Sequence, residues 1–436
     1  MRQIHIKLIV TTLILLLSVS LVSAYIYTKP FFPYLKYLLG VEKPTTYTIL
    51  LQNDTEIRAN GGFAGSFAKL TITSPRYRPN LDLSFQDIYV PNGQLDGYVD
   101  PPAPIQEAFK HGTWELANAD WEPDFPTTAM AIRWFLEKGG ETNPDILVTL
   151  NLTTIKKILD IVGPFSVREY QAEITPQNVY TFLQSQAETD FFPGSTQKKD
   201  ALTAVGKALK KKFLTLDPIQ HARIALIVKN ELDHSNLLLN SQDETFQDFL
   251  IEKGWAGTLN PGPLDTYLLV EANLGANKAN CCIQRSTEHT IYEESGTYRH
   301  RVHLILNNTS TGHNPNPPFD FSGHYISYLR FYLPSDAWNI EVLPNQSSPS
   351  ATPHIPQQVI TTTNKYGLTE IGFFHTTAAG TLSTVDLSYF LATGSAQIPY
   401  HLTLLKQNGL TSSPQSIIFK GKSYSYPLTS STTVQF

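Results

Sequence analysis

The pattern of apolar and polar positions changes character along the chain. Short apolar runs with period two at residues 47–52, 66–73 and from Leu83 onward predict three strands. The stretch at residues 117–140 then contains a predicted helix, with Pro126 near its start, apolar residues at helical spacing and a glycine pair at Gly139 as the stop signal. A strand at "PDILVTLN", a helix at "LTTIKKILDIVG" and a strand at "PFSVREY" follow. This order predicts an α/β layer domain, which residues 175–255 extend with further helices.

Alternation with period two dominates from Asp265 onward. The runs are separated by Gly, Pro, Asn and Ser turns, which is typical of an antiparallel β-sandwich. The predicted fold class is therefore α+β. Its parts are a membrane anchor with spacer at 1–40, an α/β domain at 41–284 and a β-sandwich at 285–436.

The amino-terminal pattern predicts export. Arg2, His5 and Lys7 precede an uncharged stretch over residues 8–27, which is long enough to cross a bilayer as one helix. Positive charge on the short side predicts a cytoplasmic amino terminus and an extracytoplasmic body, held at the cell membrane by a single pass. The sequence "VSA" ending at Ala24 leaves a second interpretation open, namely cleavage as a signal peptide. Under either interpretation, the part of the chain that follows the apolar stretch is predicted to be exported.

Composition narrows the range of partners. Of the 436 residues, only 16% are charged, and the net charge of −5 gives no basis for nucleic-acid binding. The only two cysteines, Cys281 and Cys282, are adjacent. Because a disulfide between neighbours is geometrically demanding, we expect two buried thiols that pack as small apolar side chains on a strand.

The polar run at residues 53–58 is the first candidate site. It places Asp54 and Arg58 directly before Gly61 and Gly62. A guanidinium suits a phosphate group, and glycines let backbone N–H groups approach one. A hairpin rim in which Arg58 pairs with a neighbouring carboxylate explains the same residues equally well.

Two further polar clusters are candidate ligand-binding sites. "ANADWEPDF" carries Asn118, Asp120 and Asp124 in a loop before a helix, where they serve either as helix caps or as ligands for a cation or a sugar. "EANLGANKAN" carries Asn273 and Lys278, with Arg285 downstream. Asn-rich turns are commonly structural, whereas the two cations would suit an anionic ligand.

Four motifs together resemble a bacterial envelope family, domain of unknown function 4012. They are "YTILLQNDTEIRANGGFAGSFAKLTI", "ELANADWEPDFPTTA", "PDILVTLNLTTIKKILDIVGP" and "VEANLGANKANCCIQR", in this order. The family description supplies no activity.

Residues 47–170 are also similar in layout to the LytR-CpsA-Psr domain, whose members transfer glycopolymers from a polyprenyl-pyrophosphate carrier to peptidoglycan. The resemblance implies that Asp54 and Arg58 hold pyrophosphate and magnesium, together with the retained Asp87. The sequence departs from that pattern in two places. A Gly-rich stretch replaces a metal-binding Asp, and Gln86 stands where a second Arg grips the pyrophosphate.

These observations predict a membrane-anchored extracytoplasmic protein of cell-envelope assembly. It would bind, and in the stronger form transfer, a polyprenyl-linked glycan or an anionic cell-wall polymer. Arg58, Asp54 and Asp87 would be catalytic, with Mg²⁺ on the two carboxylates. The alternative is a non-catalytic adhesion or scaffold protein that binds glycan or protein through its β-sandwich.

Overall fold

The computed structural model describes residues 29–110, 112–188, 197–294, 296–312, 314, 322–347, 360–392 and 399–436. The predicted anchor over residues 8–27 lies outside this range. Within the described residues, no helix is both long and apolar enough to span a membrane. By compactness the chain divides into two units, residues 1–46 with 70–83 and residues 47–69 with 84–436.

The described residues of the first unit form three short helical segments, η1 (Lys29–Tyr34), α2 (Leu35–Leu38) and η2 (Pro75–Tyr77). The Ser74 N–H donates to the carbonyl of Gly40 over 2.9 Å. Gly40 has a φ of 61°, and a Cβ there would lie 2.0 Å from the Ile72 carbonyl oxygen. Glycine at position 40 is therefore required by both the backbone conformation and the close approach.

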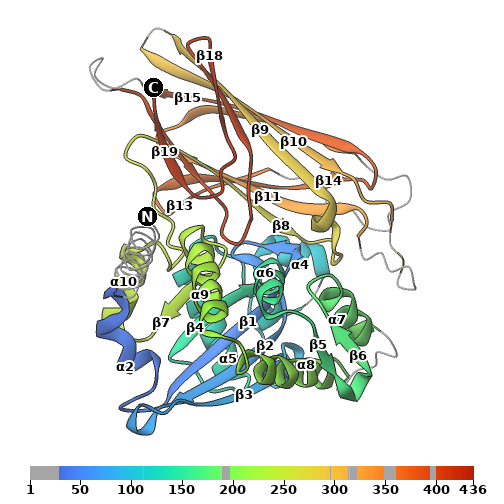
Figure 1. The fold of residues 1–436 in the computed structure, drawn as a ribbon. Coiled ribbons are helices and arrows are strands. Elements are labelled where there is room, and N and C mark those ends of the chain that lie inside the picture. Colours follow the sequence, from blue (N-terminus) through green and yellow to red (C-terminus); the bar gives the residue numbers. More distant parts are fainter. Residues whose placement is uncertain are drawn as a thin grey trace, which may run out of the picture. The chain divides into compact units, whose positions relative to one another are not determined.

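A five-stranded sheet in the order β3-β2-β1-β4-β7 forms the α/β part (Figure 1). Its strands are β1 (Thr45–Arg58), β2 (Gly61–Thr73), β3 (Asn80–Asp87), β4 (Ile146–Asn151) and β7 (Leu239–Ser241). β1 and β4 pair in parallel from Tyr47 opposite Ile146 to Gln52 opposite Asn151. The predicted strand at "PFSVREY" is β5 (Phe165–Val167), which pairs with β6 (Ala172–Ile174) in a separate two-stranded sheet.

β1 is longer than its apolar pattern predicts. The polar run at residues 53–58, expected to be a loop, is strand throughout, and β2 begins at Gly61 rather than at Ser66. Glu56 and Arg58 are both buried, so the strand continues into a region where charged side chains, not apolar ones, fill the interior.

Helices surround this sheet where the pattern predicts them. α5 begins at Phe125 after the capping residue Asp124, and it ends at Lys138 before Gly139. α6 is capped by Asn151, whose side chain accepts the Thr154 N–H over 2.8 Å. The bounds are α3 (Tyr89–Asn92), α4 (Ala103–Phe109), η3 (Leu116–Asn118), α5 (Phe125–Lys138), α6 (Leu152–Val162), η4 (Arg168–Tyr170), α7 (Val179–Glu188), α8 (Gln197–Phe213), α9 (Pro218–Asp233) and α10 (Glu244–Glu252).

Two six-stranded sheets form the predicted β-sandwich. Their orders are β12-β15-β10-β9-β17-β18 and β13-β14-β11-β8-β16-β19. Most pairings are antiparallel, while β17 pairs with β9 and β16 with β8 in parallel. The bounds are β8 (Asp265–Asn273), η5 (Ala279–Cys282), β9 (Ile283–Glu294), β10 (Thr297–Asn308), β11 (Tyr325–Pro334), β12 (Trp338–Asn345), β13 (Thr361–Lys365), β14 (Leu368–Thr377), β15 (Leu382–Ala392), β16 (His401–Leu405), β17 (Gln415–Phe419), β18 (Lys422–Tyr426) and β19 (Thr432–Gln435).

The two sheets differ in how they are covered. Val302, Leu304 and Leu306 of β10 join the core between the sheets, while the alternate residues of this strand face outward. Every residue of β8 is buried, because Leu268 and Val270 pack on the other side in a second cluster with Ala59. The boundary expected at residue 285 stays a prediction, although β8 already pairs with β11 before it.

Candidate functional site

The glycines of the β1–β2 hairpin are required by close approach of its two strands. A Cβ on Gly62 would lie 2.2 Å from the Asn53 carbonyl oxygen. Gly61 has a φ of 130°, and a Cβ there would lie 2.3 Å from Gln52 Oε1. Both glycines therefore approach their own partner strand, which accounts for them without a ligand.

Arg58 is almost fully buried, with 3% of its surface exposed. Its Nη1 donates to the Asn273 carbonyl over 2.5 Å, and its Nη2 to Glu56 Oε1 over 3.1 Å. The second oxygen of Glu56 accepts from Lys278 Nζ. Glu56 thus links Arg58 and Lys278, which are both candidate ligand-binding residues, in one largely buried ion-pair network. Both cations lie over the ring of Phe63, with Arg58 Cζ 5.2 Å and Lys278 Nζ 5.9 Å from its centroid.

A cavity of about 550 Å³ opens beside this ion-pair network. Apolar side chains make up most of its wall, and two lysines, Lys198 and Lys278, reach it together with the carboxylate of Asp87. A volume and lining of this kind are typical of a site for a small organic ligand. The apolar and aromatic lining residues are Leu51, Phe63, Tyr89, Leu152, Ile155, Tyr180, Leu183 and Leu202.

Lys198 and Asp87 form the second ionic contact of the cavity. Lys198 Nζ lies 3.0 Å from Asp87 Oδ2 and also donates to the Gly65 carbonyl. Burial lowers the pKa of Lys198, and the positive charge of Lys278 acts in the same direction, while Asp87 opposes both. In the ion pairs formed by the described residues, Asp87 pairs with Lys198, and Glu56 pairs with both Arg58 and Lys278.

Asp54 lies apart from the cavity wall. Its Oδ2 accepts the Thr153 N–H at the start of α6 over 3.3 Å, and burial raises its pKa. Asp87 is occupied by Lys198 and by the Tyr89 N–H, which donates to it over 2.9 Å. Among the described residues, no group of three or more His, Cys, Asp or Glu side chains is placed to hold a metal ion.

Magnesium at Asp54 and Asp87 therefore stays a prediction that the donor set does not fit. Mg²⁺ requires several oxygen ligands in an octahedral arrangement. Here one carboxylate is paired with a lysine and the other accepts a helical N–H.

The residues of "ANADWEPDF" form a separate buried network. Asp120 Oδ1 accepts the backbone and side-chain N–H groups of Asn60 over 3.1 and 2.8 Å, and Oδ2 accepts from Gln52 over 3.2 Å. Burial raises the pKa of Asp120 to about 6. Asp124 caps α5, and Asn118 accepts from Trp114 through its carbonyl. The structural interpretation of this cluster accounts for its contacts.

The side chains of Asn273 and Arg285 form hydrogen bonds with residues of β8 and of the segment that follows it. The Asn273 side chain donates to the Asn277 carbonyl over 3.1 Å and to Asn280 Oδ1 over 3.0 Å. Arg285 Nε donates to the buried Glu271 over 2.6 Å, and this carboxylate raises the pKa of Arg285 against the effect of burial. Neither residue lines the cavity.

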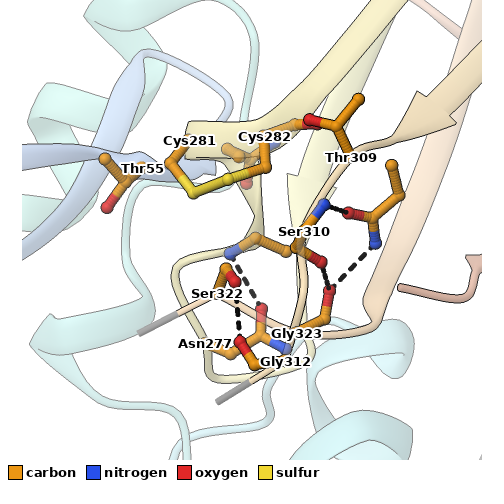
Figure 2. Close-up of a disulfide and its surroundings, with 12 residues drawn as sticks. Thr55, Asn277, Cys281, Cys282, Thr309, Ser310, Gly312, Ser322 and Gly323 are labelled. Carbon is orange, nitrogen blue, oxygen red and sulfur yellow. Dashed lines mark hydrogen bonds between the residues drawn. A yellow bond between two sulfur atoms is a disulfide. The ribbon is translucent and has the colours of Figure 1, made fainter. Parts of the chain in front are cut away.

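The prediction for the two cysteines was wrong. Cys281 and Cys282 form a disulfide at the end of η5, and Cys281 is exposed to solvent (Figure 2). They precede β9 instead of lying within a strand. The Cys282 carbonyl accepts the N–H of Thr309 over 2.9 Å, so the pair lies where η5 meets the end of β10.

Of the candidate site residues predicted from the sequence, Asp87 and Lys278 line the cavity, and Arg58 is linked to it through Glu56. Sequence reasoning missed Lys198, Tyr89 and the α7 residues Tyr180 and Leu183. Lys198 is 111 positions from Asp87 in sequence, and its place in a basic amphipathic helix was the only signal. The pairing itself is a product of tertiary packing.

Residues 42–187 match the model of the family described as "Protein of unknown function (DUF4012)". This match confirms the resemblance predicted from the motifs, of which the fourth lies outside the matched residues. No curated protein matches the sequence.

Several solved structures match about half of this chain. Lin1025 from Listeria innocua is 11% identical, covers 52% of this chain and 86% of its own, and has a TM-score of 0.26. TagV from Bacillus subtilis is 14% identical, with coverages of 52% and 87% and a TM-score of 0.30. TagT, solved bound to LI-WTA, is 10% identical, with coverages of 50% and 76% and a TM-score of 0.29. Scores this low assign no chemistry to the chain.

Proposed function

We propose that this protein binds the lipid-carrier end of a polyprenyl-linked envelope glycopolymer in the cavity beside β1. The observation that carries the proposal is a largely apolar cavity of about 550 Å³ into which Lys198 and Lys278 both project. Apolar walls favour a prenyl chain through burial of its surface, and ammonium groups favour a phosphate through charge-assisted hydrogen bonds. The predicted export of the chain and the motif resemblance to LytR-CpsA-Psr domains support the same ligand class.

We propose that the cavity binds this ligand, and we do not propose that it transfers the glycopolymer. Arg58, expected to grip a phosphate, is enclosed by the Asn273 carbonyl and Glu56 and does not line the cavity. The groups that do reach it are two lysines, each already paired with a carboxylate. An anionic head group would compete with Glu56 and Asp87 for these lysines, which predicts salt-dependent affinity.

Titration calorimetry of the full-length protein in detergent tests the proposal, with farnesyl pyrophosphate as the probe. We expect Lys278→Met to weaken its binding about tenfold, because a charge-assisted hydrogen bond contributes roughly 1.5–3 kcal/mol and tenfold corresponds to 1.4 kcal/mol. Lys69→Met is the matched control, because Lys69 also pairs with a carboxylate, Glu141, but lies outside the cavity.

Two more ligands separate the contributions of tail and head. Farnesol and inorganic pyrophosphate should each bind more weakly than the complete probe. Leu183→Glu, which places a charge in the apolar wall, should abolish binding of the prenyl ligand. Equal affinity of the parent and the Leu183→Glu protein would refute this site.

A further inference from the structure

The outward face of the β-sandwich carries a polar and aromatic groove that the proposed function does not use. It lies over β9, β10, β15 and β12, which are neighbours in one sheet. Figure 1 labels the first three of these strands. The residues of this groove enclose a volume of about 410 Å³. Its polar members in β10 are Arg299, Arg301 and His303, and the buried Val302 between them also lines it.

Strand register places an aromatic row next to the groove, and Tyr292 of this row belongs to the groove lining. Arg299 lies opposite Tyr292 of β9 and Phe390 of β15, and Phe390 lies opposite Trp338 of β12. The rings of Trp338 and Phe390 are stacked with centroids 6.1 Å apart. Trp338 is 38% exposed and Tyr292 46% exposed, so this row keeps aromatic surface accessible to solvent.

The next row along the strands is charged. Arg301 lies opposite Thr290 and Ser388, and Ser388 lies opposite Glu341. Its guanidinium carbon is 5.6 Å from the centroid of the Tyr292 ring, within range of a cation–π interaction. Arg301 and Glu341 have no hydrogen bond or ion pair within the described part of the chain.

The third row adds further acceptors. His303 lies opposite Glu288 on one side and Asp386 on the other, and its Nδ1 lies 2.7 Å from Asp386 Oδ1. Glu288 is exposed and likewise has no polar partner among the described residues. In the first row, Arg299 Nε is buried without a hydrogen-bond partner. The first two rows thus hold unpaired donors and the second and third rows hold unpaired acceptors, over about 13 Å, the length of the four residue steps from Arg299 to His303.

We propose that this groove binds a neutral polysaccharide chain. The flat C–H faces of sugar rings pack on exposed aromatic side chains, and hydroxyl and amide groups both donate and accept hydrogen bonds. Such a ligand satisfies Arg301, Glu341 and Glu288 together. The groove shares no lining residue with the cavity beside β1. It is a specific place on the β-sandwich for the glycan binding that the sequence predicts.

Charge and composition separate this ligand from others. Three carboxylates, Glu288, Glu341 and Asp386, lie among the two arginines, so a polyanion would meet like charge along the groove. Glu and Asp are depleted at the centre of a protein–protein interface, whereas Glu288, Glu341 and Asp386 all line this groove. The chemistry therefore fits a neutral glycan better than an acidic polymer or a protein.

The test is calorimetric titration of the full-length protein with two soluble probes, the hexamer of N-acetylglucosamine and cellohexaose. We expect at least one to bind, and Trp338→Ala to weaken that binding at least tenfold. Trp134→Ala is the matched control, because Trp134 is exposed to a similar extent (42%) but lies on α5, and it should leave the affinity unchanged.

Arg301→Ala provides a second variant at an exposed position, where loss of the fold is not expected; it should weaken binding about fivefold. Retained melting temperature confirms that each variant is folded. Saturating farnesyl pyrophosphate should leave oligosaccharide binding unchanged, which separates this groove from the cavity. The proposal is overturned if neither probe binds the parent protein, if Trp338→Ala binds as tightly as Trp134→Ala, or if only an acidic polysaccharide or a peptide binds.

Discussion

At the scale of single residues, the run from Asp54 to Gly62 shows how neighbours in sequence take unrelated roles. Asp54 faces the start of α6, and Arg58 is buried against the Asn273 carbonyl. Glu56, which sequence reasoning considered only as a partner of Arg58, bridges that arginine to Lys278 over 222 positions of sequence. Burial of an ion pair is costly unless the remaining hydrogen bonds are satisfied, which this chain of contacts largely achieves.

Gly62→Ala is expected to destabilise the protein strongly. Its methyl group would lie 2.2 Å from the Asn53 carbonyl oxygen, and backbone on the paired strand cannot move aside without breaking the hairpin. We expect a loss on the order of 3 kcal/mol in the free energy of unfolding. Thermal and denaturant unfolding of the full-length protein measures it.

Gly93→Ala is the control, because the nearest atom to its added methyl group lies at 3.5 Å and its φ of −68° suits any residue. It should change stability by less than about 1 kcal/mol. Equal stability of the two variants would contradict the close-approach explanation for the hairpin glycines.

At the scale of elements, capping residues serve contacts beyond their own helices. Asp124 accepts the Thr127 N–H over 3.1 Å through one oxygen and the Leu259 N–H over 3.0 Å through the other. It therefore starts α5 and also fixes the chain that leads to β8. The sequence pattern indicated the cap but not this second partner, which is 135 positions away.

Asp124→Ala should cost about 2 kcal/mol, because it removes a cap and leaves a partly buried N–H without its acceptor. Asp243→Ala should cost only about 1 kcal/mol or less, since Asp243 is an exposed cap that accepts a single backbone N–H, that of Phe246. Denaturant unfolding of both variants provides the comparison. A larger loss for Asp243→Ala would show that the Leu259 contact contributes nothing.

At the scale of the whole molecule, the interior of the β-sandwich contains buried histidines. His289 lies between the sheets, with its Nε2 2.8 Å from Gln415 Oε1 and its ring 4.5 Å from that of Tyr267. Burial lowers the pKa of His289 to about 4. His300 and His375 have lowered pKa values for the same reason, which makes neutral imidazoles a general feature of this interior.

His289 should make the protein sensitive to acid. Because the pKa is lower in the folded chain than in the unfolded chain, the unfolded chain binds the proton first as pH falls. Stability contributed by the neutral side chain is present above pH 6.5 and is lost as pH falls toward 4.

The corresponding loss is on the order of 3 kcal/mol between pH 7 and pH 4. We expect His289→Gln, which keeps a polar side chain of similar length, to lose that much less stability over the same interval. Urea unfolding of both proteins at the two pH values measures the difference. Parallel pH profiles for the parent and the variant would show that His289 does not titrate on unfolding.

Local patterns in the sequence were sufficient to predict the α+β class, the helices α5 and α6 and the two-sheet character of residues beyond 265. Periodicity, capping residues and turn glycines act within a few positions, so these features are visible without a structure. The same patterns misjudged the polar end of β1, because Glu56 and Arg58 are buried by partners distant in sequence. They also misjudged Cys281 and Cys282, whose pairing depends on the conformation of η5.

Tertiary structure alone decided which polar residues share a site. It places Asp87, Lys198 and Lys278 in the lining of one cavity. Asp120, Asp124 and Asn273 instead form hydrogen bonds that stabilise the fold. Tertiary structure also aligned Tyr292, Arg301 and Trp338 on one face through strand register. The physical reason is that a ligand site is made by side chains from several elements, and their relative positions depend on long-range packing that no local pattern encodes.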